Sequence, residues 1–375
     1  MIKNKIIKAK AEELGIDLCR ITNIKKLSEE KERLLLRKEM GSWPQPFTNE
    51  NIDELTDLRL HFKKLESTIV IGMNYNNLSS ANRFLSAYIT KKDYHQVLAE
   101  KLELLVQEIS NITDKNLKKN INYKIYVDNA PFLERAVAEK AGVGFRAKNS
   151  MLINPQYGSS FFLGEILIDL KIEADTPLDM NCGDCRKCLD NCEGGALKDA
   201  YHLDVNSCIS YLTQKKGLLP LNERKIIGGH IWGCDKCQEI CPYNQKSAAG
   251  TENNIDPALN YFDKDLEYFL TMDRKNPPRE LKATAMFWRG SRILVRNAVI
   301  AAVNLNKIEY FDLIKEKLKD NSPIIRLYAV WALSELDNDR AEIVLKKQLK
   351  LEKDKKVRDK IKIILKGGNN FGCKN

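Results

Sequence analysis

Hydrophobic and polar residues follow different patterns in successive parts of the 375-residue chain. Up to about residue 175, short runs of β-branched and aromatic residues alternate with stretches that have helical spacing. We expect strands in 67–76, 122–131 and 161–170, and an amphipathic helix in 85–109, where Leu and Val recur every three or four residues. The pattern predicts an α/β or α+β domain built around one sheet.

From about residue 285 the pattern is helical and self-similar. Three segments each place a β-branched residue before an arginine and continue as an apolar helical face: 294–305, 324–336 and 356–367. These Val-Arg or Ile-Arg pairs recur after 30 and then 32 residues. Such a period predicts stacked pairs of helices. We interpret them as short HEAT-like repeats, and the alternative is an ordinary helical bundle with coincidental spacing.

Between these regions lies a segment with few apolar runs that contains eight of the ten cysteines. Its first block is Cys182-x2-Cys185-x2-Cys188-x3-Cys192, the spacing of bacterial ferredoxins, in which the fourth cysteine binds a second cluster. A segment with so little apolar sequence needs metal to organise it.

The second block, Cys234-x2-Cys237-x3-Cys241, is the same run without its first cysteine, and Cys208 supplies the missing ligand. We therefore predict two 4Fe-4S clusters, one held by Cys182, Cys185, Cys188 and Cys241, the other by Cys192, Cys208, Cys234 and Cys237. Zinc, which would use separated pairs of cysteines, and disulfides, which are typical of small secreted domains, are the alternatives. Cys19, assigned to an N-terminal helix, and Cys373 are expected to be bystanders.

Charge and targeting signals narrow the class of protein. The N-terminus interrupts its apolar residues with Lys and Glu, unlike a signal peptide, and no apolar run approaches a membrane span of roughly 18–20 residues. A soluble, cytoplasmic protein is predicted.

The C-terminal third is basic. From Thr271 onward there are 24 Lys plus Arg and 13 Asp plus Glu, a balance of +11 in a chain of net charge +10. This basic region is either a polyanion-binding face or a solvated surface.

One acidic residue is a candidate for chemistry. Asp128 ends the second β-rich run, residues 129–131 turn the chain, and Glu134 and Arg135 open a helix that finishes at Gly142. An acid between a strand and a helix start is well placed for proton transfer in a crevice. The alternative is that Asp128 only caps the helix.

Together these motifs resemble the epoxyqueuosine reductases, cobalamin-dependent iron-sulphur enzymes of tRNA queuosine modification. The resemblance is carried by "VDNAPFLERAVAEKAGVGFRAKNSMLINPQYGSSFFLGEIL", "CGDCRKCLDNC", "CISYLTQKKGLLP", "GCDKCQEICPYN" and the helical repeats. It implies an α+β multidomain fold with an N-terminal α/β cobalamin-binding domain (1–175), a ferredoxin-like two-cluster domain (176–255) and a C-terminal α-helical HEAT-like domain that binds tRNA (256–375).

The resemblance also implies the chemistry. The clusters would reduce cobalamin, which would remove the epoxide oxygen from the modified wobble base with loss of water. Asp128, on the family's Asp-x2-Pro-x2-Glu-Arg motif, would contact cobalamin and donate the proton. The further cobalamin candidates are Lys148, Asn149, Asn154, Ser210 and Asp235; each asparagine has a turn or cap role as its alternative. The tRNA candidates are Arg292, Arg296, Arg326 and Lys356.

The partners expected from the resemblance are a tRNA anticodon stem-loop and an electron donor such as a flavodoxin or ferredoxin, with the protein a monomer. Two other functions stay open: a reductive dehalogenase-like enzyme and a non-enzymatic ferredoxin-like electron carrier. The chain departs from the family at Glu193, where proline usually follows the fourth cysteine. Because that cysteine serves the opposite cluster, we expect the cluster containing Cys192 to be held more loosely.

Overall fold

The structure is a computed structural model in which residues 2–40, 51–75, 84–90, 92–117, 120–248, 250 and 264–368 are described. Contacts between residues divide the chain into two compact units. Unit 1 contains 1–78, 91–205 and 236–257, and unit 2 contains 79–90, 206–235 and 258–375. The cysteine-rich segment is thus shared between the units, and the three domains predicted from the sequence stay a prediction. Cys373 lies outside the described residues.

Unit 1 is built on a four-stranded sheet in the order β1-β2-β6-β3. Its strands are β1 (Leu18–Thr22), β2 (Ser67–Asn74), β3 (Tyr123–Tyr126) and β6 (Phe161–Ile168), and neighbouring strands are antiparallel. The three strands expected from the sequence are confirmed. The edge strand β1 was not expected, and the placement of Cys19 on the N-terminal helix was wrong: α1 (Asn4–Glu13) stops before Gly15, whose φ of 71° leaves the helical region.

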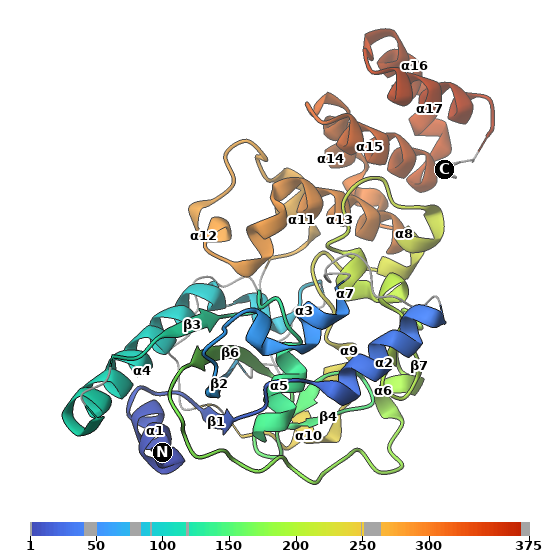
Figure 1. The fold of residues 1–375 in the computed structure, drawn as a ribbon. Helices are drawn as coiled ribbons and strands as arrows, with labels where there is room; N and C mark the ends of the chain where they lie inside the picture. The colour runs from blue at the N-terminus through green and yellow to red at the C-terminus, as the bar shows by residue number, and fades with distance from the viewer. Residues whose placement is uncertain are drawn as a thin grey trace. The chain divides into compact units, whose positions relative to one another are not determined.

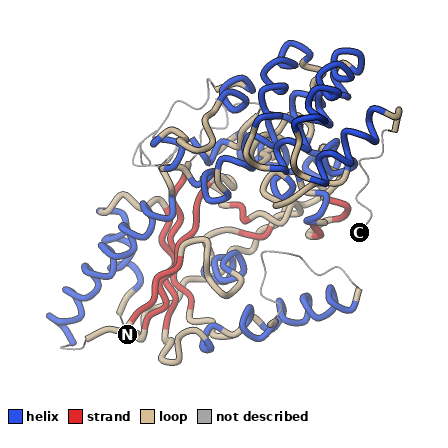
Figure 2. The backbone as a smooth tube through the Cα atoms, turned by 90° about the horizontal axis from the view of Figure 1, so that it is seen from above, coloured by secondary structure: helices blue, strands red, loops and turns tan. Residues whose placement is uncertain are grey.

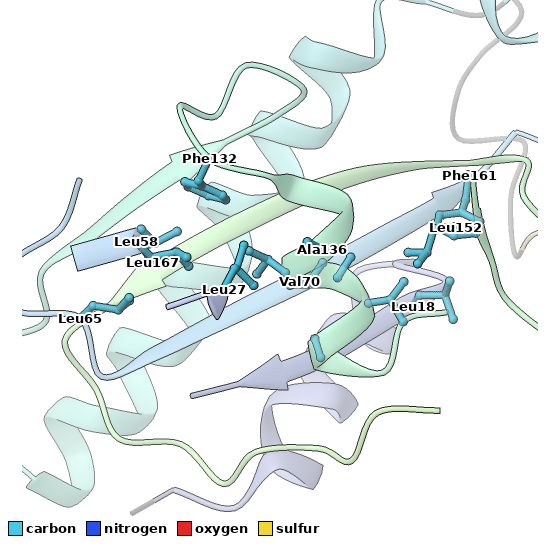
Figure 3. Close-up of a cluster of buried hydrophobic side chains, with 14 of the residues drawn as sticks. Leu18, Leu27, Leu58, Leu65, Val70, Phe132, Ala136, Leu152, Phe161 and Leu167 are labelled. Atoms are coloured by element: carbon cyan, nitrogen blue, oxygen red, sulfur yellow. The ribbon is translucent and has the colours of Figure 1, made fainter. Parts of the chain in front are cut away.

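Helices cover both faces of this sheet (Figure 2). On one face lies α4 (Tyr94–Leu117): a Cβ added at Gly164 of β6 would come within 2.9 Å of the Leu102 side chain and would make an ordinary contact of 3.5 Å with Leu98. On the other face lies α5 (Glu134–Ala141), whose Ala136 packs with Val70 and Leu167 (Figure 3). Side chains alternate along a strand, so Glu165 shares the α5 face with Leu163 and Leu167.

Short elements complete unit 1 (Figure 1). They are α2 (Ser28–Glu39), α3 (Ile52–Thr56), η1 (Leu58–Leu60), β4 (Phe145–Arg146), β5 (Leu152–Ile153), α6 (Lys187–Asp190), β7 (Leu197–Asp199), β8 (His202–Leu203), α9 (Lys236–Glu239) and α10 (Pro242–Gln245). Four of these strands form two small antiparallel ribbons, β4 with β5 and β7 with β8. None of the helices among the described residues is long and apolar enough to cross a membrane.

Unit 2 is helical apart from its connections. It contains η3 (Ala87–Thr90), α7 (Ile209–Leu212), α8 (Leu221–Ile227), α11 (Leu266–Thr271), α12 (Arg279–Lys282), η6 (Ala285–Arg289), η7 (Ile308–Tyr310), α14 (Phe311–Glu316), η8 (Lys317–Lys319) and α16 (Asn338–Leu351), while η4 (Val205–Ser207) spans the boundary. The predicted repeats coincide with α13 (Ser291–Asn304), α15 (Pro323–Leu336) and α17 (Lys355–Leu365), which begin 32 residues apart. Because α15 contacts both α13 and α17, the helices are stacked; the HEAT-like assignment stays a prediction.

The arginine of the second repeat is committed to an ion pair. Arg326 donates two hydrogen bonds to Glu352, of 2.7 and 2.8 Å, and only 2% of the Glu352 side chain is exposed. Burial raises the pKa of Glu352, but hydrogen bonds led by Arg326 outweigh it and hold that pKa below its ordinary value. Arg326 therefore stabilises the helical stack, contrary to its prediction as a phosphate contact.

Replacing Arg326 with methionine is expected to destabilise unit 2 by about 3–5 kcal/mol, because a buried carboxylate loses its partner. Since the pKa of Glu352 is lower in the folded protein, the stabilisation is complete above roughly pH 4.3 and is lost as the pH falls through the lowered value. Urea unfolding measures both effects. In the control, Arg340→Met removes an exposed pair with Asp312 and should cost about 0–1 kcal/mol; equal losses in both variants would contradict the role of Arg326.

Candidate functional site

The predicted first cluster has its four ligands together in unit 1. After burial, which is the largest cause, the neighbouring thiols of Cys182, Cys241 and Cys185 raise the pKa of Cys188. Cys182 also packs against the small apolar cluster that contains Cys241 and Phe145. All four cysteines are free of disulfides. Four converging thiols fit a 4Fe-4S cube, which takes one thiolate at each iron.

Lys148 supports the loop that carries these ligands. Its ammonium group donates hydrogen bonds to the carbonyl oxygens of Gly183, at 2.6 Å, and Cys185, at 3.0 Å. Gly183 has a φ of 51°. The lysine thus stabilises the backbone between the first two ligands, and its predicted contact with cobalamin stays a prediction.

Of the four cysteines predicted to bind the second cluster, Cys192 and Cys237 belong to unit 1, and Cys208 and Cys234 belong to unit 2. Its four-ligand grouping stays a prediction. The sulfur of Cys192 accepts a hydrogen bond of 3.3 Å from the backbone N–H of Ala196. Within the part of the chain that is described, no three His, Cys, Asp or Glu side chains are arranged to hold one metal ion together; a 4Fe-4S cube does not need this, because each of its irons takes a single protein thiolate.

Glu193, at the position of the family's proline, lies in unit 1. Its carboxylate is 3.5 Å from the ammonium group of Lys236, which stands between two cysteines of the second block. The turn after Cys192 is made by Gly195, which has a φ of 62° and whose N–H donates to the Cys192 carbonyl oxygen at 2.9 Å. An exposed ion pair of this kind stabilises a fold by only about 0–1 kcal/mol, so it does little to replace the stiffness of a proline. That the cluster containing Cys192 is held more loosely stays a prediction.

The second cysteine block is fixed to the segment that precedes β6. The N–H of Ser159 donates to Oδ1 of Asn244 at 2.6 Å, and the Ser159 hydroxyl donates to Gln238 at 3.0 Å; all three side chains are buried. Phe145 meets Tyr243 edge-on, with ring centroids 5.3 Å apart. These contacts hold the residues on both sides of Cys241 against β4 and the segment before β6.

Gly158 lies where the segment before β6 approaches the second cysteine block most closely. It has a φ of 64°, and a Cβ there would collide with the amide of Asn244. Gly158→Ala is therefore expected to destabilise unit 1 by about 1–3 kcal/mol from backbone strain alone, and more from the collision. The midpoint of thermal unfolding and the iron content of the purified protein measure the result. Gly217→Ala is the control, because Gly217 has a φ of 88° but nothing within 4 Å; an equal effect would show that strain alone matters.

Asp128 stands on the turn after β3, as the sequence predicts. Its φ of 51° is unusual for a residue other than glycine, and 61% of its side chain is exposed. The N-cap of α5 is Leu133, which makes no side-chain cap, so the alternative that Asp128 caps this helix is wrong. The carboxyl group is instead held by side chains of α4.

Two aromatic residues at the start of α4 position the Asp128 carboxyl group. The Tyr94 hydroxyl donates a hydrogen bond to Oδ2 of Asp128, and Nε2 of His95 is 3.9 Å from the same oxygen. Nδ1 of His95 lies 2.6 Å from Oδ1 of Asp93. Burial lowers the pKa of His95, but Asp93, together with Asp128 and Glu134, outweighs burial and raises it above its ordinary value. A cation is thus favoured beside Asp128.

Sequence reasoning missed Tyr94, His95 and Glu165. The first two lie in the helical stretch "KKDYHQVL", where they fit the pattern of an ordinary amphipathic helix and nothing in the sequence marks them as functional. The available signal for Glu165 was its position in "FFLGEILI", where a single acid interrupts an apolar strand that is buried along most of its length.

The other predicted cobalamin contacts are engaged within their own units. The buried amide of Asn154 forms a turn, donating to the Val143 carbonyl and accepting from the N–H groups of the two residues after Pro155. Oδ1 of Asn149 likewise accepts a hydrogen bond from the N–H of Met151, and its Nδ2 donates to the carbonyl oxygen of Cys237 at 3.4 Å. Asp235 accepts from Ser86 and Ala87. Ser210 is partly exposed, and only its carbonyl is hydrogen-bonded within the described residues.

The tRNA candidates divide by exposure. Arg292 and Lys356 are exposed. Arg296 is 1% exposed and donates to the carbonyl oxygens of Lys215, Leu212 and Thr213. Its prediction as a phosphate contact was wrong, because its guanidinium group is buried and bonded to the turn after α7.

Comparison with known proteins identifies two matching families. A profile for "4Fe-4S double cluster binding domain" matches residues 181–244, which include all eight predicted ligands. A profile for "Epoxyqueuosine reductase QueG, DUF1730" matches residues 56–129, which end just after Asp128.

Curated relatives match over nearly the whole chain. Epoxyqueuosine reductase of Bacillus subtilis is 32% identical over 358 residues, covering 93% of this chain and 91% of the relative. The enzyme of Listeria monocytogenes is 32% identical over 372 residues, with 95% of each chain covered.

Solved structures match equally. A crystal structure of epoxyqueuosine reductase with an epoxyqueuosine-modified stem loop of tyrosine tRNA has a TM-score of 0.86 at 30% identity, covering 96% of this chain and 97% of that one. A structure of the Bacillus subtilis enzyme, in which an aspartate-bearing catalytic loop is swung out of the active site, has a TM-score of 0.85 at 30% identity, covering 96% and 98%.

Proposed function

Because this chain belongs to the epoxyqueuosine reductase family of oxidoreductases, we propose that it reduces epoxyqueuosine to queuosine at the wobble position of tRNA. The observation that carries the proposal is that unit 1 contains both the four neighbouring cysteines Cys182, Cys185, Cys188 and Cys241 and the turn on which Asp128 is exposed. Family membership favours this enzyme over the dehalogenase-like and electron-carrier alternatives.

The eight cysteines would hold two 4Fe-4S clusters, in the crossed arrangement that the spacing predicts. The match of the double-cluster profile across 181–244 supports this assignment. The converging thiols of Cys182, Cys185, Cys188 and Cys241 support the crossing, because Cys241 comes from the second block. The clusters would deliver single electrons from an external flavodoxin or ferredoxin.

Cobalamin is proposed as the second cofactor, on the strength of the family resemblance. It would supply the reduced cobalt that acts on the epoxide. Of the side chains predicted to contact it, the exposed Asp128 and the partly exposed Ser210 fit this role, whereas Asn154 is used in its own turn. Asp128 would be the proton donor; the aspartate-bearing catalytic loop of the Bacillus subtilis structure supports this role.

Conversion of an epoxyqueuosine-modified stem-loop tests the function. Protein reconstituted with iron, sulphide and cobalamin, and supplied with a low-potential reductant, is expected to produce queuosine, which mass spectrometry of the digested nucleosides measures. Protein without added cobalamin is the control. Complete absence of product from protein that carries all three cofactors would overturn the proposal.

Binding of the stem-loop is expected to depend on exposed cations of unit 2. Arg292→Ala and Lys356→Ala should each weaken binding and lower the slope of log Kd against log salt concentration by about 1. Arg296→Met is the control on the same helix as Arg292: because this arginine is buried, the variant should lose stability with an unchanged slope. Unchanged slopes in the Arg292 and Lys356 variants would place the tRNA contact elsewhere.

A further inference from the structure

The proposed reaction consumes two protons for each oxygen removed. Its balance is an epoxide plus two electrons and two protons, giving a carbon–carbon double bond and water. The reduced cofactor supplies the electrons, whereas a single carboxyl group supplies one proton. If Asp128 donates the first, a second proton must reach the same oxygen before the cycle closes. Two carboxyl groups that the chemistry described so far does not use lie near Asp128.

Glu165 is buried without a hydrogen-bond donor. It is 0% exposed on the α5 face of β6, opposite Val70 and Tyr126 in the strand register. Neither of its carboxyl oxygens has a hydrogen-bond donor among the described residues. The carboxyl group of Glu134, at the start of α5, lies within hydrogen-bonding reach. Two ionised carboxylates would repel each other in so apolar a place, so one must carry a proton and donate it to the other.

Burial decides which carboxyl keeps its proton. Complete burial raises the pKa of Glu165 well above its ordinary value, and the charges of Glu134 and Asp128 add to this. Burial and the charge of Asp128 also raise the pKa of Glu134, to about 7, although the Ala130 N–H and Arg135 oppose the shift. Glu134 is only partly buried. Glu165 therefore stays protonated, while Glu134 exchanges its proton near neutral pH.

The surroundings of the pair connect it to Asp128. The Ala130 N–H, on the turn between Asp128 and α5, donates to Oε1 of Glu134 at 3.3 Å. The ionisable groups facing the pair are Asp128 from this turn, Arg135 from α5 and His95 from α4, with Tyr126 opposite Glu165 on β3. The carboxyl pair thus adjoins the turn that carries the proposed proton donor.

We propose that Glu134 stores the second proton and passes it to Asp128, with Glu165 as its neutral hydrogen-bond partner; this rests on Asp128 being the proton donor. First, the Asp128 carboxyl O–H bond breaks and an O–H bond forms on the epoxide oxygen. The resulting Asp128 carboxylate then takes the proton of Glu134 and delivers it to the same oxygen, which leaves as water. Both carboxyl groups regain protons from bulk water, and Glu165 remains protonated throughout.

Glu134→Gln tests this role, since it preserves the size of the side chain and removes the exchangeable proton. We expect turnover at neutral pH to fall by on the order of 100-fold, the lower end of what general acid–base groups contribute. The wild-type decline of rate as the pH rises through the titration of Glu134 should be absent in this variant. Glu12→Gln is the matched control, because it makes the same change at an exposed side chain of α1 outside this site, so the neutral-pH rate and the decline should persist.

Infrared difference spectra of the cluster-loaded protein without cobalamin give a readout independent of activity. A carboxylic acid band that titrates near neutral pH should be present in the wild type and absent in Glu134→Gln, whereas Glu165→Gln should lose a band that does not titrate there. If Glu134→Gln does not fold, Glu134→Asp carries the test, since it retains an acid and should keep a titrating band.

A wild-type rate and pH profile in Glu134→Gln, or no band titrating near neutral pH, would overturn the relay. Asp128→Asn separates this failure from failure of the proposed function. An inactive Asp128→Asn beside a fully active Glu134→Gln would reject the relay alone, whereas an active Asp128→Asn would reject Asp128 as the donor and the relay with it.

Discussion

Asp128→Asn is expected to lower the rate of queuosine formation by about 100- to 10,000-fold, the usual contribution of a general acid. The amide has nearly the same shape as the carboxyl group and can still accept the Tyr94 hydrogen bond, but it has no proton to give. The clusters should be retained, because no cluster ligand lies on this turn. Single-turnover assays of the reduced protein with a modified stem-loop measure the effect.

The control for this experiment is Asp179→Asn, which changes an exposed carboxylate of unit 1 outside the Asp128 turn. This variant should react at the wild-type rate. A second comparison, Tyr94→Phe, removes the hydroxyl that positions the carboxyl group and should cause a smaller loss than Asp128→Asn. Wild-type rates in Asp128→Asn would remove the residue from the chemistry.

Cys241→Ala is expected to abolish turnover and to lower the iron and acid-labile sulphide content by about half, since a cube that loses one of four thiolates is held poorly. Crossed ligation predicts which cluster is lost. Although Cys241 follows Cys234 and Cys237 in the sequence, its thiol lies beside Cys182 and Cys185. The cluster predicted for Cys192, Cys208, Cys234 and Cys237 should therefore survive, and electron paramagnetic resonance of the reduced protein would detect it.

Cys19→Ala provides the control for that measurement. Burial raises the pKa of Cys19 to about 12, so its thiol is a poor ligand, and it lies on β1. The iron content of the Cys19→Ala protein should match that of the wild type. If Cys241→Ala retained the full iron content, or if Cys182→Ala and Cys241→Ala abolished different clusters, the crossed assignment would be wrong.

The sequence predicted the features that depend on local pattern. The strands around Val70, Tyr126 and Glu165 and the three repeat helices follow from periodicity, and the grouping of Cys241 with the first block follows from the ferredoxin spacing. The strand β1 was not predicted because "LCRIT" is only five residues long and contains a charged side chain, so its pattern is too short to separate from the helical pattern before it.

Side-chain roles that depend on distant parts of the chain were not predictable. Arg296 and Arg326 occupy equivalent places in the repeat pattern and read alike in sequence. One donates to carbonyl groups some 80 residues away and the other to Glu352, so neither is positioned for a phosphate. The carboxyl pair of Glu134 and Glu165 forms only when α5 covers β6. Such contacts follow from packing, which single-sequence periodicity does not report.

The order of the segments in unit 1 has a consequence for synthesis on the ribosome. The segment that holds Gln238 and Asn244 is translated after residues 206–235 of unit 2, yet it satisfies the buried Ser159. The growing chain therefore cannot complete unit 1 when its first 205 residues have emerged. A nascent chain arrested at that length should expose the Ser159 segment to protease, and iron loading should follow, rather than precede, release of the second cysteine block.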